Sequence, residues 1–142
     1  MKKIYFACSI AGGRDHDHLY EDIVKAINGH GVKVLSERFT NKKLVAEEAA
    51  NAENILEHIH DRDMAWVKEY DAVIAEVTQP SLGVGYEIGQ AEVWNKPILA
   101  LFYEPSGKRL SPMISGSKKV TVARYNNHTE AKAAIKDFLD KI

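Results

Sequence analysis

The sequence predicts an α/β fold, a single-domain Rossmann-like (flavodoxin-like) three-layer sandwich around a five-stranded parallel sheet. Three observations predict it. Short runs rich in β-branched residues alternate with longer helical patterns, glycine-containing turns follow several of the runs, and no linker or internal repeat interrupts the 142 residues. A chain of this length can bury a core without disulfides, so we expect one domain over residues 1–142.

Five apolar runs have the length and composition of doubly buried strands. They are Ile4–Ala7, Val32–Leu35, Ala72–Val77, Pro97–Phe102 and Val120–Val122. Helices are expected from Leu19 to Ile27, over 52–70, over 83–95, and from a Thr129 cap to the C-terminus. Gly29 and Gly31 suit a left-handed end of the first helix, and residues 103–117 show no periodicity and are expected to form a long loop.

Composition and charge limit the classes of function. The chain is 45% hydrophobic and 27% charged with a net charge of -1, which is typical of a globular cytoplasmic protein. It has no basic field for a nucleic-acid polymer or an anionic membrane, and no run approaches the roughly twenty apolar residues of a membrane helix. The single cysteine, Cys8, excludes an internal disulfide and fits a reducing compartment.

Two glycine-containing turns follow predicted strands. In an open parallel sheet, ligands bind beyond the carboxyl ends of the strands, where the strand order reverses. The first turn is S-I-A-G-G-R at 9–14, and its backbone amides near a helix N-terminus suit a phosphate. It is neither a Rossmann nor a Walker motif, so by itself a turn of purely geometric use explains it equally well. The second, T-Q-P-S-L-G-V-G-Y-E at 78–87, also brings a carboxylate.

That carboxylate, Glu87, lies on the inward face of the third predicted helix together with Val84 and Ile88. In a first helical turn the macrodipole favours any exposed acid by about 0.3–1 kcal/mol. The same dipole keeps a carboxylate ionised, as a nucleophile or a cation-stabilising group requires. Because Glu87 also faces inward, a functional role is favoured.

A second acid, Asp63, falls within the apolar stripe of the second predicted helix. The stripe consists of Ile55, Leu56, Ile59, Trp66, Val67 and Tyr70. Asp63 is therefore either a buried hydrogen-bonding group or an acid that faces a site. Two carboxylates in different surroundings can break a glycosidic bond, although spacing does not show that Asp63 and Glu87 meet.

The six histidines do not form a metal motif. None belongs to an HExxH arrangement, no second cysteine supports them, and His58 and His60 lie on different sides of their helix. They are expected to be solvated helix residues, and no metal site is expected.

The starting motif I-Y-F-A-C-S-I-A-G-G-R and the central motif A-E-V-T-Q-P-S-L-G-V-G-Y-E-I-G resemble the 2'-deoxynucleoside 5'-phosphate N-hydrolases, relatives of the nucleoside 2-deoxyribosyltransferases. The resemblance covers nearly the whole chain, including H-D-R-D-M-A-W at Asp63 and L-S-P-M-I-S-G at Ser111. It implies hydrolysis of the N-glycosidic bond of 2'-deoxynucleoside 5'-monophosphates to free base and 2-deoxyribose 5-phosphate, without a metal or organic cofactor.

The resemblance also implies roles for individual residues. Glu87 would attack or stabilise the anomeric carbon, Asp63 would protonate the departing base, and Tyr5 would orient the nucleophile. Substrate binding is expected at Cys8, Ser9, Ile10, Ala11, Gly12, Gly13, Arg14, Arg38, Ser81, Gly83, Ser111 and Met113. Ser111 and Met113 lie in a segment that the family lends to the neighbouring subunit, which implies a homodimer.

One position departs from the family pattern. Relatives carry an arginine in the first loop where this chain has Ala11, and such an arginine would clamp the phosphate. Arg14 or Arg38 is expected to compensate, which a raised KM in Arg14→Ala or Arg38→Ala would show.

Three other functions stay open at this point. A deoxyribosyltransferase would share the intermediate but pass the sugar to a second base; Ala11 favours it, whereas Ser9, Ser81 and Ser111 favour the hydrolase. A ribonucleotide hydrolase of the same fold is the second alternative. The third is a non-catalytic nucleotide-binding module, which two inward acids near a phosphate disfavour.

Overall fold

The computed structural model describes residues 1–10, 17–36, 42–51 and 53–142. Its centre is a parallel sheet with the strand order β2-β1-β3-β4-β5. The strands are β1 (Lys3–Ala7), β2 (Lys33–Leu35), β3 (Ala72–Glu76), β4 (Ile98–Tyr103) and β5 (Val120–Tyr125). Every predicted strand is present and every pair is parallel, so the flavodoxin-like sheet is confirmed.

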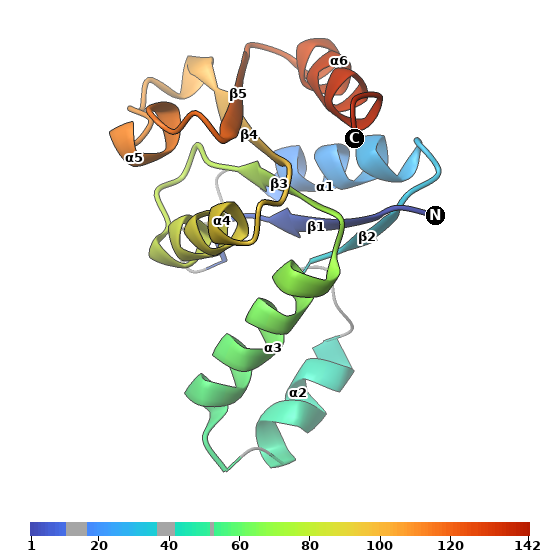
Figure 1. The fold of residues 1–142 in the computed structure, drawn as a ribbon, viewed down its shortest axis with the longest axis vertical. Coiled ribbons are helices and arrows are strands. Elements are labelled where there is room, and N and C mark those ends of the chain that lie inside the picture. The colour runs from blue at the N-terminus through green and yellow to red at the C-terminus, as the bar shows by residue number, and fades with distance from the viewer. Residues whose placement is uncertain (11–16, 37–41, 52) are drawn as a thin grey trace.

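Helices cover both faces of this sheet (Figure 1). On one face lie α1 (Asp17–Asn28) and α6 (His128–Leu139), and on the other lie α3 (Ile55–Glu69), α4 (Leu82–Val93) and the short α5 (Pro112–Ser115). The three-layer arrangement is therefore confirmed. In the described part of the chain, no helix has both the length and the apolar character needed to cross a membrane.

The three central strands, β1, β3 and β4, are buried on both faces, because successive side chains point to opposite sides and helices cover each side. In β1, Ile4 and Phe6 pack with α1 and α6, whereas Tyr5 and Ala7 pack with α3 and α4. The other central strands, β3 and β4, alternate in the same way. Two separate cores result, and Tyr5 belongs to the one beneath α3 and α4.

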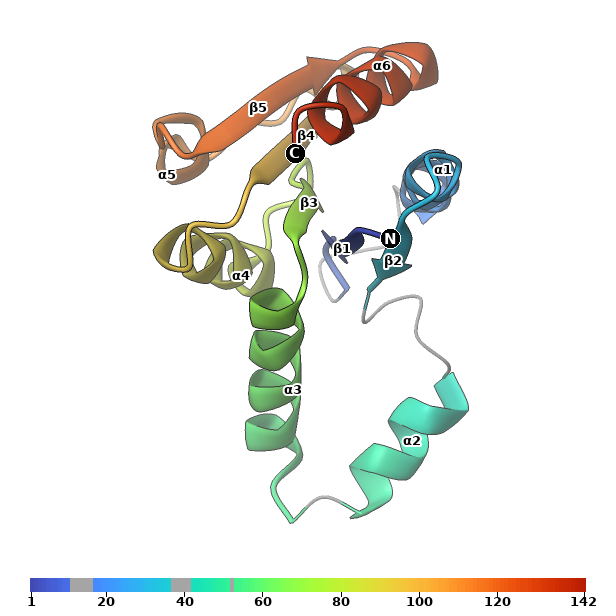
Figure 2. The same cartoon turned by 45° about the vertical axis from the view of Figure 1, so that its right-hand side comes forward.

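The helix predicted over 52–70 is present but begins later, at Ile55. The structure has two helices before β3, α2 (Lys42–Asn51) and α3, and Asn54 caps the second by accepting hydrogen bonds from the backbone of Leu56 and Glu57. Ile55 and Leu56, predicted in the apolar stripe, are exposed. The first turns of α3 extend with α2 beyond the sheet (Figure 2), so no strand lies there to bury them.

Smaller corrections concern helix ends. The last helix begins at His128, and its cap is Asn127 rather than Thr129, because the Asn127 side chain accepts a hydrogen bond from the Glu130 backbone at 2.9 Å. After α1, Gly31 adopts a left-handed φ of 69°, whereas Gly29 does not.

The stretch 103–117, predicted to lack regular structure, contains two short elements. A 3-10 turn, η2 (Glu104–Ser106), directly follows β4, and α5 precedes β5. Both are only one turn long, which is too short to give a periodic sequence pattern.

Candidate active site

The strand order reverses between β1 and β3, and the candidate site lies at this point. The chain leaves β1 for α1 on one face and leaves β3 for α4 on the other. A crevice is expected where the loops after these strands diverge. The described residues at these ends are 8–10 after β1 and 77–81 after β3.

Glu87 is held by Tyr5 across the gap between α4 and β1. The Tyr5 hydroxyl donates a hydrogen bond of 2.9 Å to Glu87 Oε1. Tyr5 is buried, whereas Glu87 is half-buried, and its neighbours Val84 and Ile88 face the core as predicted. A hydroxyl donor on a buried side chain, Tyr5, thus orients the carboxylate of Glu87, which remains partly exposed to solvent.

The position of Glu87 along its helix differs from the prediction. Since α4 begins at Leu82, Glu87 lies in the second turn and not in the first. The influence of the helix dipole falls off within the first turn. The hydrogen bond from Tyr5, and not the dipole, is therefore the main feature that positions this carboxylate.

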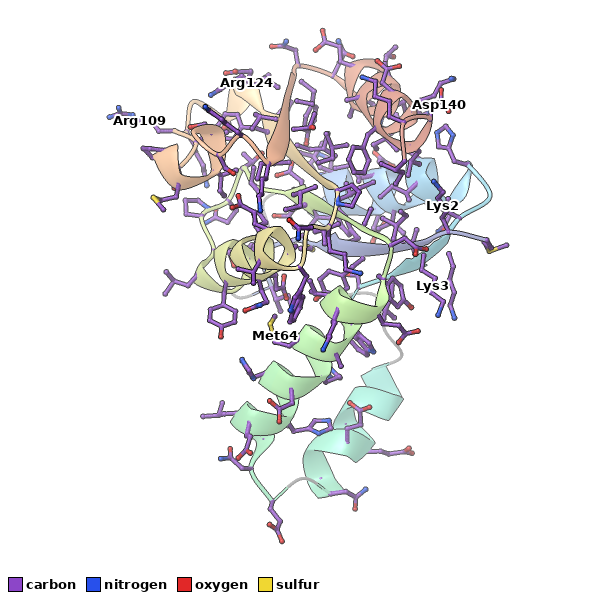
Figure 3. All side chains as sticks on the ribbon, in the orientation of Figure 1. Lys2, Lys3, Met64, Arg109, Arg124 and Asp140 are labelled. Atoms are coloured by element: carbon purple, nitrogen blue, oxygen red, sulfur yellow. The ribbon has the colours of Figure 1, made fainter. Side chains whose placement is uncertain are left out.

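Asp63 is buried on α3, a helix that packs against α4. It lies one helical turn before Val67, which packs in the same core as Tyr5, Val84 and Ile88. Figure 3 shows Met64, the next residue, between α3 and α4. The structure thus brings the helices of the two predicted acids together above Tyr5.

Arg62 is a functional candidate that the sequence did not reveal. Its Nε and Nη2 atoms both lie 3.0 Å from Asp63 Oδ1. Adjacent residues of a helix point to different sides, so helical spacing does not predict this ion pair. The long, flexible arginine side chain bends across the helix to reach its neighbour. Asp63 is therefore a buried hydrogen-bonding group, one of the two roles expected for it.

The Arg62 guanidinium is itself fixed. It stacks on the Trp66 ring at 4.7 Å, and its Nη1 lies 3.2 Å from Glu48 of α2. Only 8% of the Arg62 side chain is exposed. Hydrogen bonds from His58 and from Arg62 hold the pKa of the Glu48 carboxyl below its usual range. Asp63 therefore contacts a guanidinium group, that of Arg62, which residues of α2 and α3 hold in place.

Two histidines predicted to be simply solvated have partners. His58 Nε2 lies 3.3 Å from Glu48 Oε2, and His60 Nε2 lies 3.2 Å from the hydroxyl of Tyr86, next to Glu87. The His60 and Tyr86 rings meet edge to face at 5.7 Å. Within the described ranges, no group of three or more His, Cys, Asp or Glu side chains is placed to hold a metal.

The first-loop residues are only partly described. The Cys8 side chain is buried in the core beneath α1 and Ser9 is buried as well, whereas Ile10 is half exposed. The burial of Cys8 leaves its backbone, and not its thiol, for contact with a ligand. The predicted positions Ala11, Gly12, Gly13, Arg14 and Arg38 lie outside the described residues.

Three of the four remaining predicted residues line a cavity of about 610 Å³ between α4 and the segment 109–114. Ser81, Ser111 and Met113 line it, whereas Glu87 does not; Gly83 is exposed in the first turn of α4. The Ser81 hydroxyl caps α4, and the Ser111 hydroxyl caps α5. Arg109, also at this cavity, extends outward from the body of the protein (Figure 3).

Comparison with known proteins identifies the family. A family model described as nucleoside 2-deoxyribosyltransferase matches residues 4–134. The chain belongs to the nucleoside 2-deoxyribosyltransferase family. Among the similar proteins, the 5-hydroxymethyl-dUMP N-hydrolase of Mus musculus is 49% identical to this chain over 116 residues. The matched region covers 80% of this chain and 65% of that protein. The putative 2'-deoxynucleoside 5'-phosphate N-hydrolase 1 of Nematostella vectensis is 46% identical over 117 residues, 82% of this chain and 78% of its own.

A solved structure shares the fold of this nucleoside 2-deoxyribosyltransferase family member. The CMP N-glycosidase BcmB of Clostridium botulinum superposes with a TM-score of 0.66 and 21% identity, covering 95% of this chain and 99% of that one. At this identity the likeness shows the fold alone.

Proposed function

We propose that the chain hydrolyses the N-glycosidic bond of 2'-deoxynucleoside 5'-monophosphates, giving the free base and 2-deoxyribose 5-phosphate. The observation that carries the proposal is the carboxylate of Glu87 held by Tyr5, with a second acid, Asp63, on the adjacent helix. The relatives from Mus musculus and Nematostella vectensis, named as N-hydrolases of deoxynucleotides, support it.

The proposed reaction begins at the anomeric carbon. A Glu87 carboxylate oxygen attacks C1', the bond from C1' to the base nitrogen breaks, and its electron pair leaves with the base. The Tyr5 hydroxyl keeps the carboxylate from rotating away, since it binds one of its oxygens. Water then attacks C1' of the glycosyl ester and gives a proton to the carboxylate of Asp63, which releases Glu87, completes 2-deoxyribose 5-phosphate and restores the acid for the next turnover.

Asp63 is proposed to give the departing base its proton. A base that leaves as an anion is a poor leaving group, so a proton delivered during bond breaking lowers the barrier. Arg62 contacts Asp63 Oδ1 through both Nε and Nη2, which orients the carboxyl group. Preorganisation of this kind saves the cost of orienting the acid at each turnover.

The substrate class is tested by base release. Purified protein is incubated with the four common deoxynucleoside monophosphates, 5-hydroxymethyl-dUMP, the matching nucleosides and the matching ribonucleotides, and free base is followed by chromatography. We expect release from deoxynucleotides and little from nucleosides. Base exchange among nucleosides that requires a second base would make the protein a transferase, and binding of a deoxynucleotide without release would make it a binding module.

We also propose that two copies of the chain form a dimer that completes each site. Large apolar side chains are exposed along α4 and α5, among them Leu82 at 97%, Met113 at 84% and Val93 at 69%. Large apolar side chains exposed on neighbouring helices are a feature of protein interfaces. Ser111 and Met113 line a cavity that Glu87 of their own chain does not reach, which supports their use by a neighbouring site.

Mixed dimers test this sharing of residues. Glu87→Gln and Ser111→Ala chains, each impaired alone, are co-expressed with different tags, and the mixed dimer is isolated. If Ser111 serves the neighbour, one of the two sites then has both native residues, so half of the wild-type activity per dimer returns. Activity no higher than that of Ser111→Ala would contradict the sharing, and a monomer in sedimentation would contradict the dimer.

A further inference from the structure

A buried acid that the proposed mechanism does not use lies at the end of β3. Glu76 is fully buried. Its place in the strand, two residues after Ile74, puts its side chain on the α1 side of the sheet, opposite to Tyr5. The backbone N–H of Thr78 donates a hydrogen bond of 2.7 Å to Oε1, and the Tyr125 hydroxyl donates to Oε2.

These hydrogen bonds continue to the neighbouring strands. The Thr78 hydroxyl, also fully buried, accepts a hydrogen bond of 2.8 Å from the backbone of Tyr103 at the end of β4. The rings of Tyr103 and Tyr125 lie 5.4 Å apart. Glu76, Thr78 and Tyr125, named here the rim network, thus join the carboxyl ends of β3, β4 and β5.

The rim network stands directly beneath candidate binding residues. Thr78 is followed by only two residues before Ser81, whose hydroxyl caps α4 through the backbone N–H of Val84. Tyr103 opens the segment that leads to Ser111. The rim network therefore anchors the backbone that precedes each serine: Thr78 before Ser81, and Tyr103 before the segment that contains Ser111.

A carboxyl group at this depth is costly. Burial raises the pKa of Glu76, because removal from water disfavours the charged form, and the hydrogen bonds from Tyr125 and Thr78 only partly oppose this. An apolar side chain would fill the same core without that cost, but it could not bind the Thr78 backbone and Tyr125 at once.

We propose that Glu76 is a positioning residue: through Thr78 and Tyr125 it fixes the loop from β3 to α4, so that Ser81 and the first turn of α4 are held in place for the substrate. The inference rests on the proposed function, since it concerns binding at that site. It adds a residue on the opposite face of the sheet from Glu87.

Three substitutions separate positioning from bulk packing. Glu76→Gln keeps an acceptor for Thr78 and a partner for Tyr125, Glu76→Leu removes both, and Tyr125→Phe removes one hydroxyl. For a deoxynucleotide we expect KM to rise about tenfold in Glu76→Leu and Tyr125→Phe while kcat changes less than about threefold, with Glu76→Gln close to wild type. An unchanged KM in folded Tyr125→Phe, or a fall in kcat alone, would overturn the proposal.

A second readout does not depend on any catalytic activity. Amide hydrogen exchange of the residues 79–85 other than Pro80, which has no amide hydrogen, is measured in the ligand-free protein, where a hydrolase, a transferase and a binding module would behave alike. We expect faster exchange of this loop in Tyr125→Phe and wild-type exchange in Glu76→Gln, with α6 unchanged in both. Equal protection of residues 79–85 in all variants would contradict the proposal even if the protein hydrolysed no nucleotide.

Stability against pH tests whether the buried carboxyl behaves as described. The titratable groups near it are Tyr125 of β5 and Tyr20 of α1, and Cys8, which follows β1, lies near Tyr20. Because the pKa of Glu76 is raised in the folded state, its contribution is complete below its ordinary pKa of 4.5 and is lost as the pH rises toward the folded value. Wild type should therefore lose stability relative to Glu76→Gln above that pH. A constant difference between them would contradict a buried titrating Glu76.

Discussion

Replacement of Glu87 by Gln is expected to lower kcat by about ten thousand-fold or more. The amide has nearly the same shape and can still accept the Tyr5 hydrogen bond, so the site geometry is retained. It cannot attack C1' or stabilise a developing cation, since it carries no negative charge. Single-turnover base release from a deoxynucleotide measures the loss, and thermal unfolding checks that the fold is unchanged.

Tyr5→Phe is the matched control for this loss. It keeps the Glu87 carboxylate and removes only the 2.9 Å hydrogen bond that orients it. We expect kcat to fall by about ten- to a hundredfold, which corresponds to the loss of one hydrogen bond to a charged group. Near-normal kcat in Glu87→Gln would remove Glu87 from the mechanism. An equal loss in both variants would instead give Tyr5 a chemical role.

Asp63→Asn is expected to show the second largest effect, and its size should depend on the leaving base. With dGMP, whose base needs a proton to depart, we expect kcat to fall by about a hundred- to ten thousand-fold. With the N7-methylated form of dGMP the base is already cationic and leaves neutral, so the variant should approach wild type. The ratio of the two rates, measured for each variant, reports the proton donor directly.

Asp61→Asn provides the matched comparison for the same helix. Asp61 is two residues away, is 68% exposed in its side chain and contacts His60 rather than Arg62. We expect both substrates to react at wild-type rates in this variant. If Asp63→Asn lost the same factor on both substrates, Asp63 would act by holding Arg62 and the α3 helix, and not by protonating the base.

The sequence by itself determined the sheet, its layers and the inward direction of both acids. Runs of β-branched residues identify strands because such residues suit a doubly buried pleated surface. Helical periodicity places Asp63 and Glu87 on core-facing sides, since the face of a residue depends only on its neighbours in the same helix. The helix α2 was not predicted, because Leu44 and Val45 are its only large apolar residues and its sequence therefore shows no apolar stripe.

Only the tertiary structure decided which of these groups meet. Tyr5 and Glu87 are 82 residues apart, and Glu76 and Tyr125 are 49 apart, so each pair depends on strand order and register. Arg62 reaches the adjacent Asp63 through the rotamer that its side chain adopts, and helical periodicity does not encode a rotamer. Periodicity fixes the direction of a side chain, whereas the distance between two side chains depends on how separate elements pack. The residue types of the site were therefore visible in the sequence, and the resemblance implied that Tyr5 orients Glu87, but the geometry of that hydrogen bond and the contact of Arg62 with Asp63 were not.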